Sequence, residues 1–356
     1  MQSGPTRGGT QYLVLNIQHS AFNIQHSAFN IQHSTFNIQH SAFNIQHSAF
    51  NIQHSTFNIQ HSAHHFYTPL VKPLAITLGD PAGIGAEVVE KALQGLDVPV
   101  RLFGAVDGPI RYGEISADYG RIALHAIDDA LDAIARGECS ALVTAPIHKQ
   151  SIALAGCPFP GHTELLADRA GLKRYAHDYA MYFDSPSLRT VLLSVHEPLR
   201  RAIESIKAED IVALAKLMTR EYAKLYGNAP RIGVAAVNPH AGEGGRFGDE
   251  EETIARGVAM ANGIAISGPH PADMLFLAAR EGKYDVVMAM YHDQALIPVK
   301  TLDFARSVNV TIGLPYLRVS VDHGTAFDIA GKGIADAAPM RYAIEWAARH
   351  AEKFAS

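Results

Sequence analysis

Three histidines occupy comparable places along the chain, each after a short apolar run that predicts a buried strand. They are His196, His240 and His292. Because parallel strands bring their carboxyl ends to one edge of a sheet, we expect the three imidazoles to converge there. One histidine at a strand end is more often a hydrogen-bonded structural residue, whereas three in equivalent positions favour a metal site. Neutral imidazoles suit Zn²⁺, with Mg²⁺ or Co²⁺ as alternatives, and such an ion lowers the pKa of a bound hydroxyl before a hydride leaves its carbon.

The stretch from Tyr291 to Thr325 adds groups that bind anions. These groups are Lys300, Asn309 and Arg318. Two cations and an amide within one short stretch favour a small phosphorylated or carboxylated substrate. A polar loop with surface charges is the plain alternative, since such residues are common in loops.

Two carboxylates are candidates for a role beside the histidines. Asp273 and Asp293 can orient an imidazole or accept the proton of a hydroxyl, and Lys300 joins them as a third candidate for a catalytic role. For Asp273, a favourable charge at a helix N-terminus is an equally good interpretation. Which of the three would be the general base does not follow from the sequence.

Glycine-rich loops and a helix start offer further places for an anion. The loop 79–85 lies between a predicted strand and a predicted helix, where backbone N–H groups can hold an anion, but it does not fit the dinucleotide pattern GxGxxG. The loop 238–248 contains a histidine and Arg246, and its glycines let it approach a ligand closely. His162 and Thr163 open a predicted helix, where an imidazole and a hydroxyl suit a phosphate or a carboxylate. Thr163 could also be only an N-cap.

Strand and helix signals alternate along the chain after residue 65. Strands are expected at 74–78, 100–103, 141–145, 179–183, 190–195, 232–237 and 284–290. Helices are expected at 86–93, 128–136, 164–170, 209–226, 250–261, 272–279 and 340–354. This alternation predicts an α/β fold with a largely parallel sheet, and one compact two-lobed catalytic unit over residues 66–356.

The composition argues against several classes of protein. The chain has 356 residues and carries 30 Lys and Arg against 35 Asp and Glu, so a nucleic-acid surface with its basic excess is not expected. Its two cysteines, Cys139 and Cys157, have no CxxC neighbour, which favours a reducing cytoplasm over a disulfide framework. No apolar run approaches the roughly 18 residues of a membrane span, and the run at 12–15 is too short for a signal peptide.

Residues 1–65 form a separate segment of low complexity. A unit NIQHSAF recurs every seven residues from Asn16, with a histidine in each unit. The spacing of its isoleucine and phenylalanine does not match a coiled coil, and the segment has no Asp, Glu or Lys, so we expect disorder. The near-identical units also suggest a translated tandem DNA repeat upstream of the true start, and their histidines could bind metal ions weakly.

Eight motifs follow one another from about residue 74 to the C-terminus. They read LGDPAGIGAE, VTAPIHK, GHTELLA, VNPHAGEGGRFGDEE, GPHPAD, MYHDQALIPVK, VNVTIGLP and SVDHGTAFDIAG. Together they resemble the 4-hydroxythreonine-4-phosphate dehydrogenase family of vitamin B6 biosynthesis. Each motif is moderately specific, the ordered set is very specific, and the resemblance leaves out the repeat segment.

The resemblance implies an isocitrate/isopropylmalate-dehydrogenase-like α/β/α fold with an active-site cleft. It implies a cytoplasmic homodimer that binds NAD, possibly NADP, without a Rossmann fingerprint. It implies metal binding by His196, His240 and His292, with one of these ligands on the partner subunit relative to the other two. The residues implied to contact the substrate are His162, Thr163, Lys300, Asn309 and Arg318. All these positions match the family pattern.

The implied reaction is oxidation of the secondary alcohol of 4-phosphohydroxy-L-threonine by NAD⁺. The product, 2-amino-3-oxo-4-phosphooxybutanoate, then loses CO₂ to give 3-amino-2-oxopropyl phosphate, in pyridoxal 5'-phosphate biosynthesis. A paralogous dehydrogenase for D-threonate or D-erythronate 4-phosphate would share the metal and phosphate sites, so it remains an alternative. A non-enzymatic protein that uses the repeat histidines as a metal sink is a third, remote hypothesis.

Deletion of residues 1–65 separates the enzyme from the metal sink. We expect the shortened protein to keep its dehydrogenase activity and about one metal ion per active site, because every motif lies downstream of the repeats. Metal analysis and an assay of NADH formation on both forms check this. Loss of most of the metal from a folded, shortened protein would instead support the sink.

Overall fold

The structure is a computed structural model that describes residues 72–354. These residues belong to one compact unit. The repeat segment and the expected boundary at residue 65 lie outside the described residues.

Ten strands form the sheet at the centre of this unit. They are β1 (Leu74–Thr77), β2 (Val100–Phe103), β3 (Leu142–Thr144), β4 (Ala180–Asp184), β5 (Arg189–Leu192), β6 (Ile232–Ala235), β7 (Ile266–His270), β8 (Val286–Ala289), β9 (Val308–Ile312) and β10 (Arg318–Ser320). Their order across the sheet is β2-β1-β3-β10-β9-β4-β5-β8-β6-β7. Six neighbouring pairs are parallel. The three central pairs β10–β9, β9–β4 and β4–β5 are antiparallel, so the expected largely parallel sheet is confirmed, with an antiparallel centre.

Helices connect and cover the strands. The α-helices are α4 (Gly85–Leu93), α5 (Ala117–Ala135), α6 (Lys149–Leu154), α7 (His162–Arg169), α8 (Leu199–Glu204), α9 (Ala208–Tyr226), α10 (Glu250–Met260), α11 (Ala272–Arg280), α12 (His292–Asp303) and α13 (Ala338–His350). The short 3₁₀ helices are η1 (Pro239–Glu243), η2 (Phe304–Arg306) and η3 (Ala351–Phe354).

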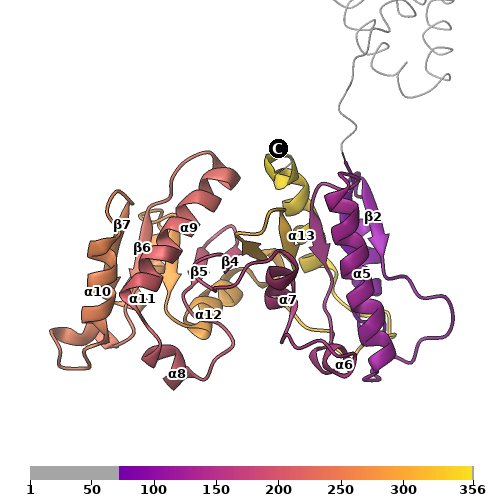
Figure 1. The fold of residues 1–356 in the computed structure, drawn as a ribbon, viewed down its shortest axis with the longest axis horizontal. Coiled ribbons are helices and arrows are strands. Elements are labelled where there is room, and N and C mark those ends of the chain that lie inside the picture. The colour runs from indigo at the N-terminus through magenta and orange to yellow at the C-terminus, as the bar shows by residue number, and fades with distance from the viewer. Residues whose placement is uncertain (1–71, 355–356) are drawn as a thin grey trace, which may run out of the picture. The chain divides into compact units, whose positions relative to one another are not determined.

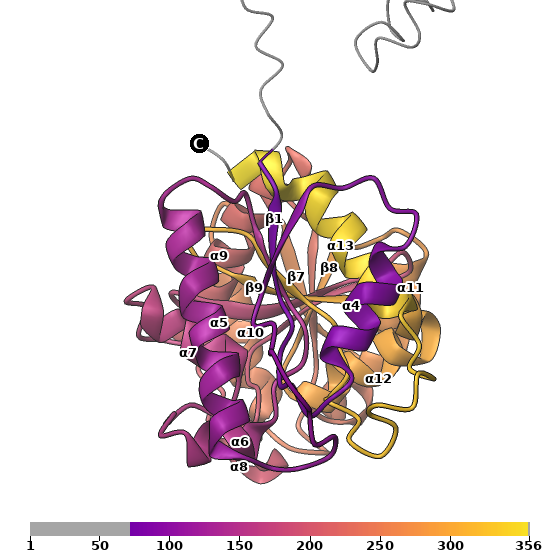
Figure 2. The ribbon, with the colours of Figure 1, turned by 90° about the vertical axis from the view of Figure 1, so that its right-hand side faces the viewer.

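Helices lie on both faces of the sheet. Successive side chains of a strand point to opposite faces, so neighbouring residues enter different apolar layers. Ile76 of β1 joins the layer that contains Trp346 of α13, whereas Ala75 joins the layer that contains Ile127 of α5. Figure 2 shows α5 on one side of β1 and α4 with α13 on the other. The expected α/β/α class is confirmed.

Two lobes share the one sheet. Strands β1 to β3 with α5 form one lobe, and β6 and β7 with α9, α10 and α11 form the other (Figure 1). The antiparallel strands β4 and β5 lie between them together with α12 (Figure 1). In the described part of the chain, no helix is long and apolar enough to cross a membrane.

Several elements were missed by the sequence patterns. The stretch 291–325, for which no helix or strand was predicted and a polar loop was the alternative interpretation, contains α12, β9 and β10. Pro298 lies inside α12 and its polar residues blur the helical period, while β10 has only three residues, too few for an alternating pattern. Helix α5 begins at Ala117 instead of residue 128, because the Ser116 hydroxyl accepts a hydrogen bond from the Asp118 N–H at 3.1 Å and caps it.

A buried polar cluster surrounds Asp184 at the end of β4. Its carboxylate accepts hydrogen bonds from the hydroxyls of Tyr182 and Tyr226, and the Arg189 guanidinium lies 3.4 Å away. Burial raises the pKa of Asp184 to about 6, although the attraction of Arg189 opposes this shift. The folded protein therefore binds a proton at Asp184 more tightly than the unfolded chain does.

Asp184→Asn is expected to remove a pH dependence of stability. A raised carboxyl pKa stabilises the fold fully below its unfolded value of 3.8, and this stabilisation is lost as the pH rises through about 6. Between about pH 4 and pH 7, the free energy of unfolding of the native protein should fall by roughly 2 to 3 kcal/mol relative to that of the variant. The unpaired Arg189 lowers the variant's stability by the same amount across this range, because arginine does not titrate there.

Urea unfolding at a series of pH values measures this difference. Asp129→Asn, which changes an exposed carboxylate on α5, is the control and should show no comparable trend. Parallel stability curves for the native protein and Asp184→Asn would contradict the prediction.

Candidate active site

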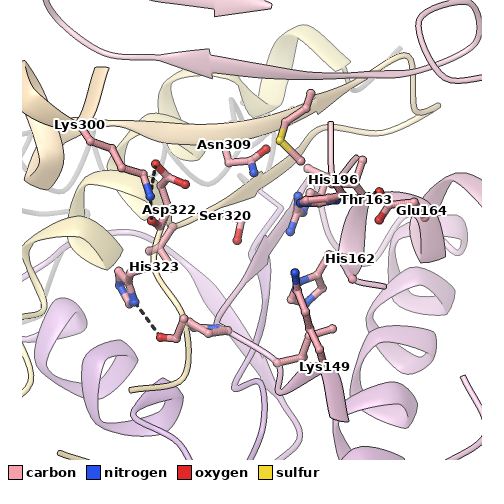
Figure 3. Close-up of a pocket in the computed structure, with 17 residues that line it drawn as sticks. Lys149, His162, Thr163, Glu164, His196, Lys300, Asn309, Ser320, Asp322 and His323 are labelled. Atoms are coloured by element: carbon pink, nitrogen blue, oxygen red, sulfur yellow. Dashed lines mark hydrogen bonds and ion pairs between the residues drawn. The ribbon is translucent and has the colours of Figure 1, made fainter. Parts of the chain in front are cut away.

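One cavity of about 340 Å³ collects all the residues that the sequence assigned to the substrate. These residues are His162, Thr163, Lys300, Asn309 and Arg318. Figure 3 shows two groups of side chains facing each other across this cavity. Lys300, Asp322 and His323 lie on one wall, and Lys149, His162 and His196 lie on the other. The residues of one predicted subsite thus come from α7, α12, β9 and β10, which are far apart in the sequence.

Arg318 is a buried cation at the floor of the cavity. It is 2% exposed, and its guanidinium donates hydrogen bonds to the hydroxyls of Thr311 at 3.0 Å and Thr144 at 2.8 Å. Its Nε has no partner among the described residues. Burial lowers the pKa of Arg318 to about 10, so the side chain remains charged at neutral pH. A buried cation held only by hydroxyl groups is suited to an anionic ligand.

His162 supplies a neutral group next to this cation. Burial, and then the nearby charge of Arg318, hold the pKa of His162 well below its usual range. Its Nε2 is buried without a partner among the described residues. Thr163 is the second residue of α7 and is 4% exposed, and α7 has no side-chain cap at its N-terminus. The alternative interpretation of Thr163 as an N-cap is therefore wrong.

Lys300 lies on the wall opposite His162 and is paired with Asp322, which lies on the same wall as Lys300. Its Nζ donates a hydrogen bond to the main-chain carbonyl of Asp322 at 3.0 Å and lies 3.3 Å from the carboxylate. The Asp322 side chain is 11% exposed, and its burial raises the pKa of the carboxyl although the charge of Lys300 lowers it. The main-chain carbonyl and the carboxylate of Asp322 thus both hold the Lys300 ammonium group at the cavity.

Buried polar atoms without partners gather around this cavity. Within residues 72–354 they include His162 Nε2, Glu164 Oε2, Asn309 Oδ1, Arg318 Nε and His323 Nε2. Such atoms are rare in folded proteins, because each loses its hydrogen bonds to water without replacement. Their concentration here indicates a polar ligand with both donors and acceptors.

Two of the three predicted metal ligands lie side by side. His196 follows β5 and His292 opens α12 after β8, and the parallel pairing of these strands brings the ring centroids within 5.9 Å. Glu164 lies 3.2 Å from Nδ1 of His196, and Asp293 lies 2.7 Å from Nδ1 of His292. Because a carboxylate accepts a hydrogen bond from Nδ1–H, the Nε2 atom of each neutral imidazole keeps a free lone pair. This donor set fits a divalent metal ion.

His240 does not join this pair within the chain. Its strand β6 neighbours β8, but four residues separate the strand end from the histidine, which is exposed. The described residues contain no group of three His, Cys, Asp or Glu side chains that could hold a metal ion. A second cavity of about 250 Å³, lined by His196 and His292, lies next to the first and could admit a further ligand. The three-histidine site stays a prediction.

The two predicted acid–base carboxylates differ in their surroundings. Asp293 directly contacts His292, as expected for a residue that orients an imidazole. Asp273 is exposed in the first turn of α11, where its charge favours the helix, and it lines neither cavity. Because α11 packs against η1, Asp273 and His240 lie in the same region of the molecule.

Four titratable side chains that line the cavity had no role predicted from the sequence. They are Lys149, Glu164, Asp322 and His323. Each lies inside or next to a motif quoted above, so its position was visible, but its partner was not. The contact between Glu164 and His196, for example, joins residues that are 32 positions apart.

Comparisons with known proteins identify the family of the chain. The sequence model of the family described as pyridoxal phosphate biosynthetic protein PdxA matches residues 37–347. A 4-hydroxythreonine-4-phosphate dehydrogenase of Beijerinckia indica is 41% identical over 324 residues, which cover 78% of this chain and 94% of that protein. A D-threonate 4-phosphate dehydrogenase of Salmonella typhimurium is 38% identical, over 78% of this chain and 98% of that protein.

A solved structure has the same fold. The 4-hydroxythreonine-4-phosphate dehydrogenase of Klebsiella pneumoniae superposes with a TM-score of 0.67 at 35% sequence identity, and the match covers 80% of this chain and all of that one. Sequence and structure thus agree over most of the described residues. The chain belongs to the family of the pyridoxal phosphate biosynthetic protein PdxA.

Proposed function

We propose that this protein is a metal- and NAD-dependent dehydrogenase that oxidises the secondary alcohol of 4-phosphohydroxy-L-threonine. The carrying observation is a cavity with a buried cation and a second cation, which shares His196 with a neighbouring cavity where His196 and His292 lie side by side. The product is 2-amino-3-oxo-4-phosphooxybutanoate, which loses CO₂ to give 3-amino-2-oxopropyl phosphate in pyridoxal 5'-phosphate biosynthesis. The names of the family and of its relatives support this assignment.

The anionic groups of the substrate match the charges of the cavity. Arg318 and Lys300, with Lys149 as a third cation, bind the phosphate and the carboxylate. His162 and Thr163 at the start of α7 and the Asn309 amide add neutral hydrogen bonds. A bound anion would also compensate the buried charge of Arg318, which no carboxylate partners among the described residues.

The oriented imidazoles would hold a metal ion at the reacting end of the substrate. His196 and His292 present free Nε2 atoms to a divalent ion, Zn²⁺ or alternatively Mg²⁺ or Co²⁺, and His240 of a second copy completes the set in a homodimer. When bound, such an ion supplies Lewis acidity that lowers the pKa of the substrate hydroxyl. Asp293, Asp273 and, in its neutral amine form only, Lys300 are the candidates to accept the hydroxyl proton while the hydride leaves the carbon.

NAD⁺, or NADP⁺, accepts the hydride. Nδ1 of His323 lies 3.1 Å from the Gly324 carbonyl and must donate to it, so the orphaned Nε2 is an acceptor. A ribose hydroxyl or the carboxamide of the cofactor is a donor of the right kind for this atom. A cytoplasmic location fits the free cysteines Cys139 and Cys157.

A paralogous activity on D-threonate or D-erythronate 4-phosphate is the alternative. The relative named for D-threonate 4-phosphate is 38% identical, close to the 41% of the relative named for the amino-acid substrate. Both substrates carry a phosphate, a carboxylate and a secondary alcohol, so the same cavity accommodates either.

NADH formation by the purified protein tests the assignment. We expect a higher kcat/KM for 4-phosphohydroxy-L-threonine than for D-threonate 4-phosphate, and loss of activity with a chelator. Preference for the sugar acid would leave the proposed site unchanged but would indicate a role in sugar-acid catabolism. Absence of NADH with both substrates would contradict the proposal.

Arg318→Lys is expected to raise KM for the phosphorylated substrate by about tenfold or more, with a much smaller effect on KM for NAD⁺. Lysine keeps the positive charge, but it lacks the planar guanidinium that can hydrogen-bond Thr144, Thr311 and an anion at the same time. Steady-state kinetics on the folded variant measure both constants. Equal increases in the two would argue against a place for Arg318 on the substrate.

A further inference from the structure

The loop that presents His240 has an unusual backbone. Six consecutive residues, 240 to 245, have positive φ angles. Three of them are not glycine: His240 at 54°, Ala241 at 53° and Glu243 at 44°. Residues with a Cβ disfavour this left-handed region, so the local sequence alone does not stabilise the turn. Contacts from outside the turn must hold it.

Those contacts come from two carboxylates at the start of α10, with Glu251 making most of them. Glu250 accepts only the Asn238 side-chain amide, at 2.7 Å. Glu251, in the first turn of α10, is 8% exposed. Its Oε1 accepts the backbone N–H groups of Val237 at 3.0 Å and Asn238 at 2.8 Å, and its Oε2 accepts the Asn238 side-chain amide at 2.9 Å. Three donors from two consecutive residues thus bind one side chain, directly before the strained turn.

Two glycines let the loop close around this carboxylate. A Cβ on Gly242 would lie 2.9 Å from Glu251 Oε2, and a Cβ on Gly248 would lie 2.5 Å from the Asn238 amide nitrogen. Both glycines also have positive φ, of 75° and 126°. The loop therefore packs closely against Glu251 at Gly242 and against Asn238 at Gly248.

We propose that Glu251 is the positioning residue that fixes this loop and so sets the direction of His240. The proposal rests on the proposed metal site, to which His240 of one copy would contribute in another. His240 is exposed, and its ring lies 6.5 Å from the half-exposed ring of Phe247, so the loop directs both rings outward. A loop that is already ordered loses less conformational entropy when its histidine binds an ion. Metal affinity therefore depends on a carboxylate that does not touch the metal.

Glu251→Gln tests this role by Co²⁺ titration of the metal-free full-length protein. Glutamine has one oxygen for three donors, and its NH₂ group faces N–H groups. We expect Co²⁺ to bind about tenfold or more weakly, with the visible absorption of the complex changed as in His240→Ala. The repeat histidines give the same background in all variants, so the difference between variants reports on the site.

Limited trypsin digestion gives a readout that does not need the metal. Arg246 lies in the exposed loop, and release of the loop should speed cleavage after it. Glu252→Gln is the matched control, because it removes the same charge from the same helical turn at an exposed position without a hydrogen-bond partner among the described residues. Glu252→Gln should behave like the native protein in both experiments.

Three outcomes separate this proposal from the metal site itself. A folded Glu251→Gln protein with native Co²⁺ affinity and native trypsin sensitivity overturns the role of Glu251. Native Co²⁺ affinity in His240→Ala overturns the metal ligand instead, and trypsin sensitivity then still tests the loop. If Glu251→Gln does not fold, Asn238→Ala removes the side-chain amide that Glu250 and Glu251 both bind but keeps the two backbone contacts of Glu251. A change of the same sign but smaller size is then expected, and no change overturns the proposal.

Discussion

The buried charge of Arg318 is the constraint around which the site is built. Its guanidinium lies at the junction of β3, β9 and β10 and is bonded only to threonine hydroxyls. Removal of a cation from water costs several kcal/mol, and hydroxyl dipoles recover only part of this. Strand β10 pairs with β3 on one side and with β9 on the other, so the fold places an uncompensated positive charge at the lining of this cavity. Burial and, second, the charge of Arg318 keep His162 neutral next to it.

A second constraint is the state of the imidazoles at the neighbouring strand ends. Glu164 and Asp293 each bind one Nδ1–H, which leaves the Nε2 lone pairs available. His196 lines both cavities, so these imidazoles lie next to the cationic groups of the first one. This arrangement occurs here in a member of the PdxA family.

The loop after β6 has an unfavourable backbone conformation that contacts from outside the loop stabilise. Left-handed residues with side chains are unstable alone and persist only where surrounding contacts determine them. Here the contacts come from the first turn of the next helix, so the loop and α10 form one unit. The two glycines that line the Glu251 contact explain part of the glycine-rich composition of this motif, which local flexibility alone does not.

The sequence by itself determined the local features. Apolar runs predicted most strands and long helices within a few residues, and the ordered motifs identified the family. They also pointed to five residues that the structure brings together in one cavity. Only the tertiary structure decided the partners: Asp322 for Lys300, Glu164 for His196, and the outward direction of His240. Local periodicity depends on residues a few positions apart. These contacts depend instead on the order of strands in the sheet, which is set by packing between distant segments.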